Sequence, residues 1–147
     1  MASAIDWWPE PAAGDLVWCH FPNDLDLTLG SKPRPALILT VFDDNAPCYR
    51  VRVAYGTSQK TRKLYIGEFV IADTERSAFK LSGLSYTTKF NLGRIVELPY
   101  NAEWFSVPPA IPYGQIPKLG LLHPSLTQKV RAAWSAVTRA ANSKRGQ

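Results

Sequence analysis

A series of short segments rich in β-branched and aromatic residues dominates the chain between residues 15 and 98. Turn residues separate four of them: DLVWCHF at 15–21, PALILTVF at 35–42, CYRVRVAYG at 48–56 and LYIGEFVIA at 64–72. Residues 85–91 and 94–98 are predicted to form two shorter final strands, and residues 75–80 a short helix. Because no long helical segments alternate with these strands, the sequence predicts a mainly β fold in the form of a small barrel.

Side-chain alternation indicates how the strands are exposed. In the third segment Arg50 and Arg52 alternate with apolar residues, which predicts a half-exposed strand with a basic outer face. In the first segment His20 shares a face with Trp18. Gly67 interrupts the fourth segment, where we expect a bulge or a sharp bend.

The chain changes character after the barrel segments. Residues 99–124 contain six prolines, whose missing amide donors exclude regular structure. Large apolar side chains in this stretch, Trp104 and Phe105 among them, argue against a solvated linker, so we expect the segment to wrap around the barrel.

The last predicted element is an amphipathic helix over residues 125–142. Ser125 and Gln128 form a capping-box pattern, and one helical stripe is apolar: Leu126, Val130, Ala133, Trp134 and Val137. This helix either packs on the barrel or binds a partner. Barrel, wrapping segment and helix together predict a single domain over 1–147.

Composition bounds the class of protein. The chain has 147 residues, 46% of them hydrophobic, which is enough for one domain with a real core. No stretch is long and apolar enough for a transmembrane helix, and the acidic start lacks the basic region of a signal peptide, so the cytoplasm is the default location.

The basic charge is unevenly distributed. The whole chain has a formal net charge of +5. Its first 26 residues contain five acidic residues and no Lys or Arg. Residues 27–147 therefore contain 17 basic and 7 acidic residues, and their net charge is 17 − 7 = +10. Such a field favours an anionic partner, with nucleic acid first, although a basic balance can also serve solubility alone.

Cysteine and histidine are scarce. Cys19 and Cys48 are too few for a disulfide scaffold or a zinc site, and their apolar contexts predict buried free thiols. The two histidines, His20 and His123, lie far apart in the sequence, so no metal site is expected.

Three segments in register carry a family resemblance. GDLVW at 14–18, GSKPRPALIL at 30–39 and VAYGTSQKTRKLYIGEFVIA at 53–72 together resemble the MazF/PemK/Kid family, in a match that spans roughly residues 14–98. The resemblance implies an SH3-like barrel that forms a homodimer and acts as the toxin of a type II toxin-antitoxin system. It also implies cleavage of single-stranded mRNA by 2′-hydroxyl attack without metal or cofactor, and silencing by a cognate antitoxin.

Arg34 lies between Pro33 and Pro35 at the start of the second strand segment. A guanidinium is always charged and binds two phosphate oxygens at once, which suits stabilisation of a phosphorane-like transition state. The two prolines restrict the backbone here, so less entropy is lost on binding. Alternatively, Arg34 forms a structural ion pair with Asp24 or Asp26.

A hydroxyl pair and a basic loop follow the third strand segment. Thr57 and Ser58 match the Thr-Ser pair of Kid-like members and are predicted to orient the scissile phosphate. The predicted RNA-binding residues are Ser31, Lys32, Gln59, Lys60, Arg62 and Asn91. A solvated loop would show the same composition.

The sequence departs from the family pattern at the position of the general base. Lys89 takes the family's basic position and is a predicted catalytic acid, whereas Asn91 stands where the family has an aspartate, and an amide cannot accept the proton. The candidate bases are His20, Asp24 and Asp26, although His20 also fits a packed or hydrogen-bonded residue.

Three functions follow as alternatives. The first is an endoribonuclease, slow if it relies on Arg34 and positioning alone. The second is a non-catalytic SH3-like barrel that binds nucleic acid or a protein partner, which Asn91 and the Pro-rich extension favour. The third is a toxin that acts on a protein, since a related barrel acts on DNA gyrase.

Overall fold

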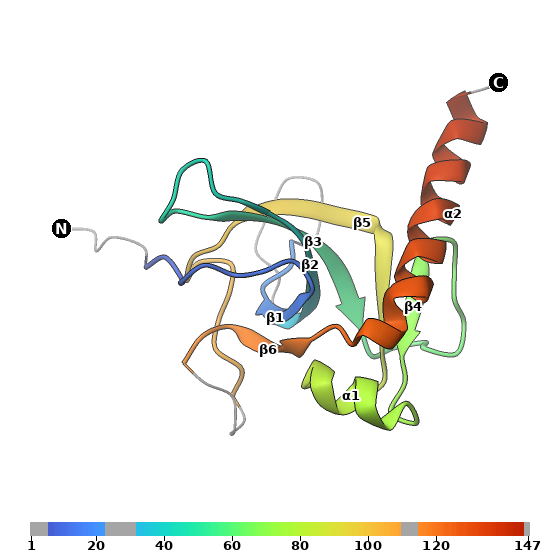
Figure 1. The fold of residues 1–147 in the computed structure, drawn as a ribbon, viewed down its shortest axis with the longest axis horizontal. Helices are drawn as coiled ribbons and strands as arrows, with labels where there is room; N and C mark the ends of the chain where they lie inside the picture. Colours follow the sequence, from blue (N-terminus) through green and yellow to red (C-terminus); the bar gives the residue numbers. More distant parts are fainter. Residues whose placement is uncertain (1–5, 23–31, 110–114, 146–147) are drawn as a thin grey trace.

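The computed structural model describes residues 6–22, 32–109 and 115–145. Six strands form one antiparallel sheet in the order β4-β5-β3-β2-β1-β6, which curls into a half-barrel (Figure 1). The strands are β1 Asp15–Cys19, β2 Arg34–Phe42, β3 Arg50–Thr57, β4 Glu68–Ile71, β5 Thr88–Pro99 and β6 Lys118–Leu121. The helices are α1 Arg76–Ser82, the 3-10 turn η1 Pro124–Leu126 and α2 Thr127–Arg145. The predicted mainly β class with a C-terminal helix is confirmed.

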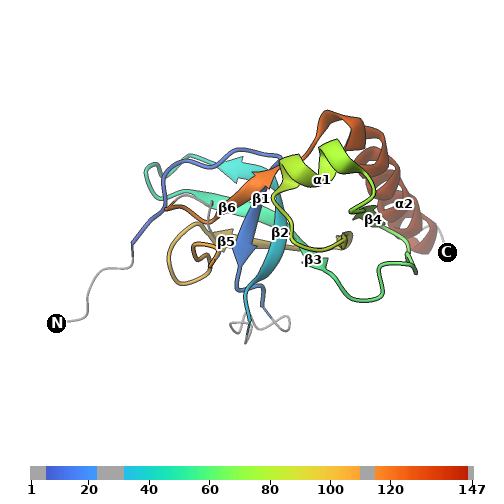
Figure 2. The ribbon, with the colours of Figure 1, turned by 90° about the horizontal axis from the view of Figure 1, so that it is seen from below.

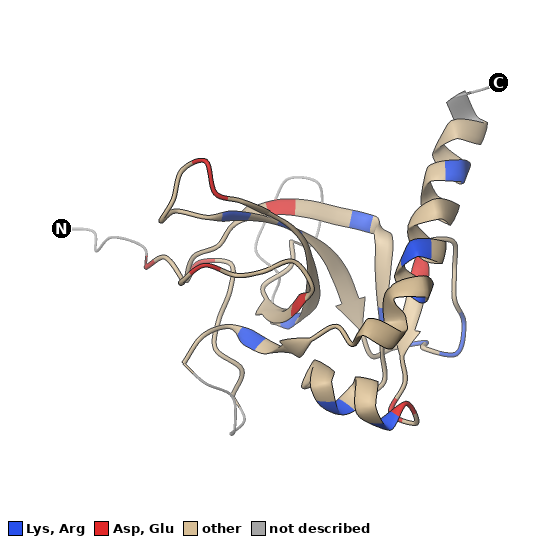
Figure 3. Cartoon of the chain, in the orientation of Figure 1, with Lys and Arg blue, Asp and Glu red and all other residues tan. Residues whose placement is uncertain are grey.

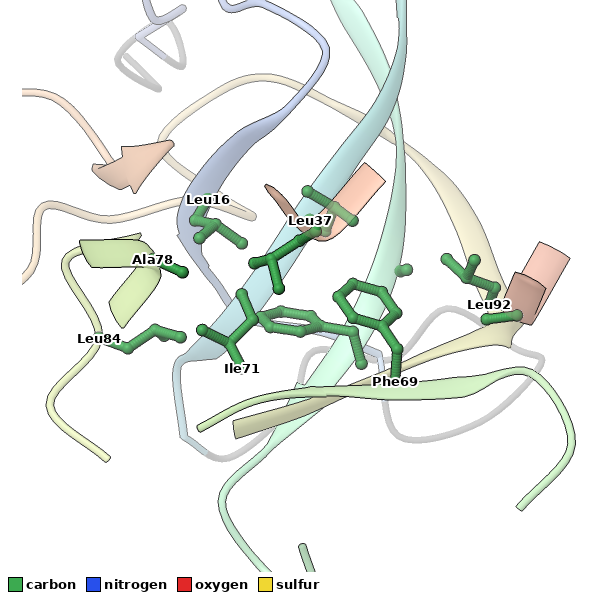
Figure 4. Packing of buried hydrophobic residues seen from close by; sticks show 11 residues of the cluster. Leu16, Leu37, Phe69, Ile71, Ala78, Leu84 and Leu92 are labelled. Carbon is green, nitrogen blue, oxygen red and sulfur yellow. The ribbon is translucent and has the colours of Figure 1, made fainter. Parts of the chain in front are cut away.

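Both faces of the sheet are buried over much of its area. On one face, alternate residues such as Leu16, Leu37 and Phe90 pack with Ala78 of α1 and Ala133 of α2, and Figure 4 shows part of this cluster. Both helices lie on this side of the sheet (Figure 2). The strand residues that alternate with those of the first cluster face the other side of the sheet. There they form a second cluster: Val17, Cys19, Phe21, Ala36, Ile38, Val51, Val53 and Leu98.

The segment after β5 completes the second cluster. Tyr100, Trp104 and Phe105 are buried there, and the backbone amide of His20 donates to the carbonyl of Trp104 over 2.7 Å. The burial of both faces explains why central strands such as PALIL read as continuous apolar runs.

Three strand predictions are wrong in detail. The two expected final strands are one strand of 12 residues, β5, because an irregularity at Ala54/Tyr55 absorbs the extra residues and pairing continues on both sides. Strand β4 begins only at Glu68, since Gly67 has a φ of 88°. Regular structure does occur within 99–124: the proline-free stretch Lys118–Leu121 forms β6 and pairs with β1.

The C-terminal helix differs from its prediction in its start, its end and its exposed stripe. The side chain of His123, and not that of Ser125, caps the 3-10 turn η1 that precedes α2: its Nδ1 accepts the Ser125 amide over 3.0 Å. The helix then continues to Arg145 and extends past the sheet (Figure 1). Trp134, expected on the packed stripe, is 49% exposed, because the sheet contacts only the face that carries Ala133 and Val137.

The two thiols are both free but differ in burial. Cys19 is fully buried in β1, where desolvation raises the pKa of its thiol. Cys48 is only half-buried, contrary to prediction, because it lies in the turn before β3 and not in a strand.

Candidate active site

Arg34 opens strand β2 at the rim of the second cluster. It pairs with Cys19 of β1, so its side chain lies on the same face as Cys19 and Ala36. Ala36 pairs in turn with Tyr55 of β3, and the guanidinium carbon of Arg34 lies 6.0 Å from the centroid of the Tyr55 ring. The sheet therefore directs Arg34 toward an aromatic ring at the edge of the core.

A second arginine joins this ring. The guanidinium carbon of Arg94 lies 4.2 Å from the Tyr55 centroid and 5.4 Å from that of Phe21, and the two rings meet edge-on at 5.2 Å. Phe21, Arg34, Tyr55 and Arg94 form what we name the arginine–tyrosine cluster. Sequence reasoning missed Tyr55 and Arg94, because Arg94 reaches the ring only through the irregular pairing in which Asn91 faces Tyr55 and Ile95 faces Ala54.

Thr57 continues the same face toward the sheet edge. It pairs with Lys89 of β5, and continuing the β2–β3 register by two pairs beyond Ala36 and Tyr55 places Arg34 beside it. Arg34, Thr57 and Lys89 thus form a row across three adjacent strands, about 10 Å long at the Cα atoms for two spacings of about 4.8 Å. Thr57 Oγ1 accepts the Gln59 amide over 3.1 Å, which leaves the hydroxyl proton for an acceptor such as a phosphate oxygen.

A pocket of about 250 Å³ adjoins this row at the strand ends. Arg34, Thr57 and Ser58 line it, so the structure brings three of the four predicted catalytic residues together. Most of the remaining lining is aromatic or apolar and includes Trp18, Pro35, Tyr86 and Leu119, and Ser85 and Thr88 are also part of it. Trp18, Pro35 and Leu119 lie on the side of the first cluster, so the pocket meets Arg34 and Thr57 at the strand ends from the opposite face of the sheet.

Lys89, the fourth predicted catalytic residue, does not line that pocket. Its Nζ lies 3.1 Å from Glu68 Oε1 and donates to the Lys63 carbonyl over 3.0 Å, and the Tyr65 ring centroid is 5.3 Å away. The side chains of Lys89 and Glu68 are only 6% and 8% exposed. Sequence reasoning did not single out Glu68, because the partnership depends on β4 pairing with β5.

The remaining predicted residues are dispersed. Asn91 lies on the same face as Lys89, and its Oδ1 accepts the Gly93 amide over 2.7 Å. His20 is half-buried, with its Nε2 3.3 Å from Ser106 Oγ. Lys32 is exposed at the start of the described segment before β2. Ser31, Asp24 and Asp26 lie outside the described residues, so the Arg34 ion pair with either aspartate stays a prediction.

The loop after β3 is basic and exposed. Gln59, Lys60 and Arg62 are all exposed, and Lys60 has a φ of 52°, an uncommon value for a residue with a side chain. Figure 3 shows basic residues in this loop and along α2, with acidic residues on the N-terminal segment and the β2–β3 turn. No cluster of three or more metal-ligating side chains occurs in the described part of the chain. Within the same residues, no helix is long and apolar enough to cross a membrane.

Comparison with known proteins identifies the fold class. No protein-family model matches the sequence, and no curated protein matches it significantly. Among solved structures, the chain is similar to an endoribonuclease in complex with its cognate antitoxin from a mycobacterial species. The TM-score is 0.55 at 18% sequence identity, over 88% of this chain and 95% of the other. The chain therefore shares the fold of this endoribonuclease, which is the fold that the MazF/PemK/Kid resemblance implied.

Proposed function

We propose that this protein is a metal-independent endoribonuclease of the MazF/PemK type, the toxin of a type II toxin-antitoxin system. The observation that carries the proposal is the row of Arg34, Thr57 and Lys89 across one face of the sheet. The row combines a cation, a hydroxyl and a proton donor, which are groups that phosphodiester cleavage by an RNA 2′-hydroxyl requires. The shared fold with a solved endoribonuclease supports it.

Each residue of the row has a distinct role in the proposed reaction. Arg34 binds the non-bridging oxygens of the scissile phosphate and stabilises the negative charge that grows as the 2′-oxygen attacks phosphorus. Thr57 and Ser58 orient the phosphate by donating hydroxyl protons. Lys89 protonates the departing 5′-oxygen, and the products carry a 2′,3′-cyclic phosphate and a 5′-hydroxyl.

Single-stranded RNA reaches the row along exposed basic residues. Lys60 and Arg62 neutralise backbone phosphates, and Lys32, Gln59, Ser31 and Asn91 add polar contacts. The arginine–tyrosine cluster extends this path, because an exposed arginine on an aromatic ring offers both a phosphate contact and a stacking surface.

The proposed partners follow from the same resemblance. A homodimer would place two basic faces beside one groove, and a cognate antitoxin would silence the enzyme in the cytoplasm. Light scattering tests the homodimer, and an open reading frame for a small acidic protein directly upstream would supply the antitoxin.

Arg34→Ala tests the proposed function. We expect the wild-type protein to cut mixed-sequence single-stranded RNA in EDTA, and Arg34→Ala to lose 100-fold or more of the rate, on the order of the loss of one oxyanion donor. The variant should also lose growth arrest while keeping its circular dichroism spectrum. Arg139→Ala on α2 removes an equal charge far along the exposed helix and should cut normally.

The alternative is a binding module without cleavage, which the burial of Lys89 and the bound Asn91 oxygen favour. RNA that binds the wild-type protein but yields no fragments ending in cyclic phosphate would support the module. Intact RNA together with stalled gyrase in cells would instead select a protein-targeting toxin.

A further inference from the structure

Glu68 opens strand β4 directly opposite Asn91 of β5. Directly paired residues project from the same face of an antiparallel pair, so Glu68 stands on the face that carries Lys89 and Thr57. Asn91 is the position at which the sequence lacks the expected acid. The structure thus places a carboxylate one strand away from the position where it is missing.

The two oxygens of this carboxylate have different surroundings. Oε1 accepts the Tyr65 amide over 2.7 Å and the Lys89 Nζ over 3.1 Å. Oε2 accepts no hydrogen bond from any described residue. One oxygen is held in place and the other can accept a proton, as a general base requires.

The segment after the basic loop holds the pair. The Lys63 carbonyl accepts from Lys89 over 3.0 Å, the Tyr65 amide donates to Glu68, and the Tyr65 ring lies over the lysine. Asn91, in contrast, uses its side-chain oxygen to bind the Gly93 amide within the β5 irregularity. The local backbone therefore binds the Asn91 oxygen within β5, whereas the charged pair joins Lys89 of β5 to Glu68 of β4.

We propose that Glu68 is the proton-accepting residue of the RNA cleavage proposed above, in place of an acid at position 91. Glu68 Oε2 takes the proton of the 2′-hydroxyl as the bond from the 2′-oxygen to phosphorus forms. The bond from phosphorus to the 5′-oxygen breaks, and Lys89 Nζ gives its proton to that oxygen. Transfer of a proton from Glu68 to Lys89 across their contact restores both groups, so the cycle needs no further reactant.

Glu68→Gln tests this role, which rests on the proposed endoribonuclease function. Gln keeps the shape and the Tyr65 contact but cannot take the proton. We expect single-turnover cleavage of single-stranded RNA in EDTA to slow by 100-fold or more, a typical contribution of a general base, while RNA affinity changes less than threefold. The rate of the wild-type protein should fall toward acidic pH, and the residual rate of Glu68→Gln should not.

A modified substrate separates the base from the acid. In RNA with sulfur in place of the bridging 5′-oxygen, the leaving thiolate needs no proton, so Lys89→Met should recover most of its rate. Glu68→Gln should stay slow on this substrate, because the 2′-hydroxyl must still lose its proton. Recovery of both variants, or of neither, would contradict the assignment.

Three results would overturn the proposal in distinguishable ways. Wild-type protein that binds RNA without cutting it overturns the endoribonuclease and the Glu68 role together. Wild-type cleavage with Glu68→Gln within threefold of it overturns the Glu68 role alone. Should Glu68→Gln fail to fold, the wild-type protein decides: cleavage that does not slow toward acidic pH excludes a carboxylate base.

Discussion

At the scale of single residues, Arg34 is positioned by strand pairing as well as by its two prolines. It pairs with Cys19 of β1, and its side chain lies on the same face of the sheet as Ala36 and Tyr55. A side chain at the rim of a packed face loses little freedom when it binds phosphate.

The stability of the protein should fall in mildly alkaline solution because of Cys19. Its pKa is raised by burial, so the folded state keeps the thiol proton while the unfolded chain releases it above a pKa of about 8.5. The contribution is fully present below that pH, and we expect a loss of about 1.4 kcal/mol per pH unit above it. Burial likewise raises the pKa of Tyr100, with Asp15 and Cys19 adding to the shift, so a second decline begins above a pH of about 10.

Urea unfolding between pH 7 and 10 measures this decline. Cys19→Ala should lower stability at pH 7 but flatten its pH dependence below pH 10. Cys48→Ala, which removes the half-buried thiol, serves as the control and should keep the wild-type slope. An unchanged slope in Cys19→Ala would assign the pH dependence to other groups.

At the scale of elements, the register of four strands assembles the site. Arg34, Thr57, Lys89 and Glu68 come from β2, β3, β5 and β4, and none is adjacent to another in the sequence. Their alignment depends on close packing at the strand ends, where Gly56 of β3 lies against both β2 and β5. A Cβ there would lie 2.6 Å from the Pro35 carbonyl oxygen and 2.7 Å from the Phe90 ring.

Gly56→Ala should therefore disturb both stability and cleavage. Because a backbone oxygen and a fully buried ring must both shift, we expect a loss of about 1–3 kcal/mol in urea unfolding. The shift moves Pro35, and with it Arg34, so cleavage should slow by more than the loss of folded protein explains. Ser58→Ala is the control for stability, since Ser58 is exposed one residue beyond the strand. Wild-type stability in Gly56→Ala would show that β2 and β3 can separate here without cost.

At the scale of the whole molecule, charge is arranged by segment. Residues 27–147 have a net charge of +10, and the exposed loop after β3 contributes to it. The acidic N-terminal segment lies on the other side of the sheet from α2 (Figure 3). Binding of single-stranded RNA should accordingly release counterions and weaken with salt.

The salt dependence can be assigned to individual residues. For single strands, each neutralised phosphate contributes about 0.7 to the slope of log affinity against log salt. The double variant Lys60→Ala/Arg62→Ala should reduce that slope by about 1.4, measured by fluorescence anisotropy on Arg34→Ala protein to prevent cleavage. Arg139→Ala/Arg131→Ala on α2 is the matched control, and an equal reduction there would place the RNA on the helix.

The sequence by itself determined the mainly β class and most of the strand segments, because alternation and turn chemistry are local, and with the family resemblance it singled out three residues of one pocket, Arg34, Thr57 and Ser58. The division into a single domain stays a prediction. Only the tertiary structure decided that β5 is continuous, that Arg94 reaches Tyr55 and that Glu68 meets Lys89. Each of these depends on which strands pair and in what register, and register is set by burial on both faces of the sheet and not by neighbours in the chain.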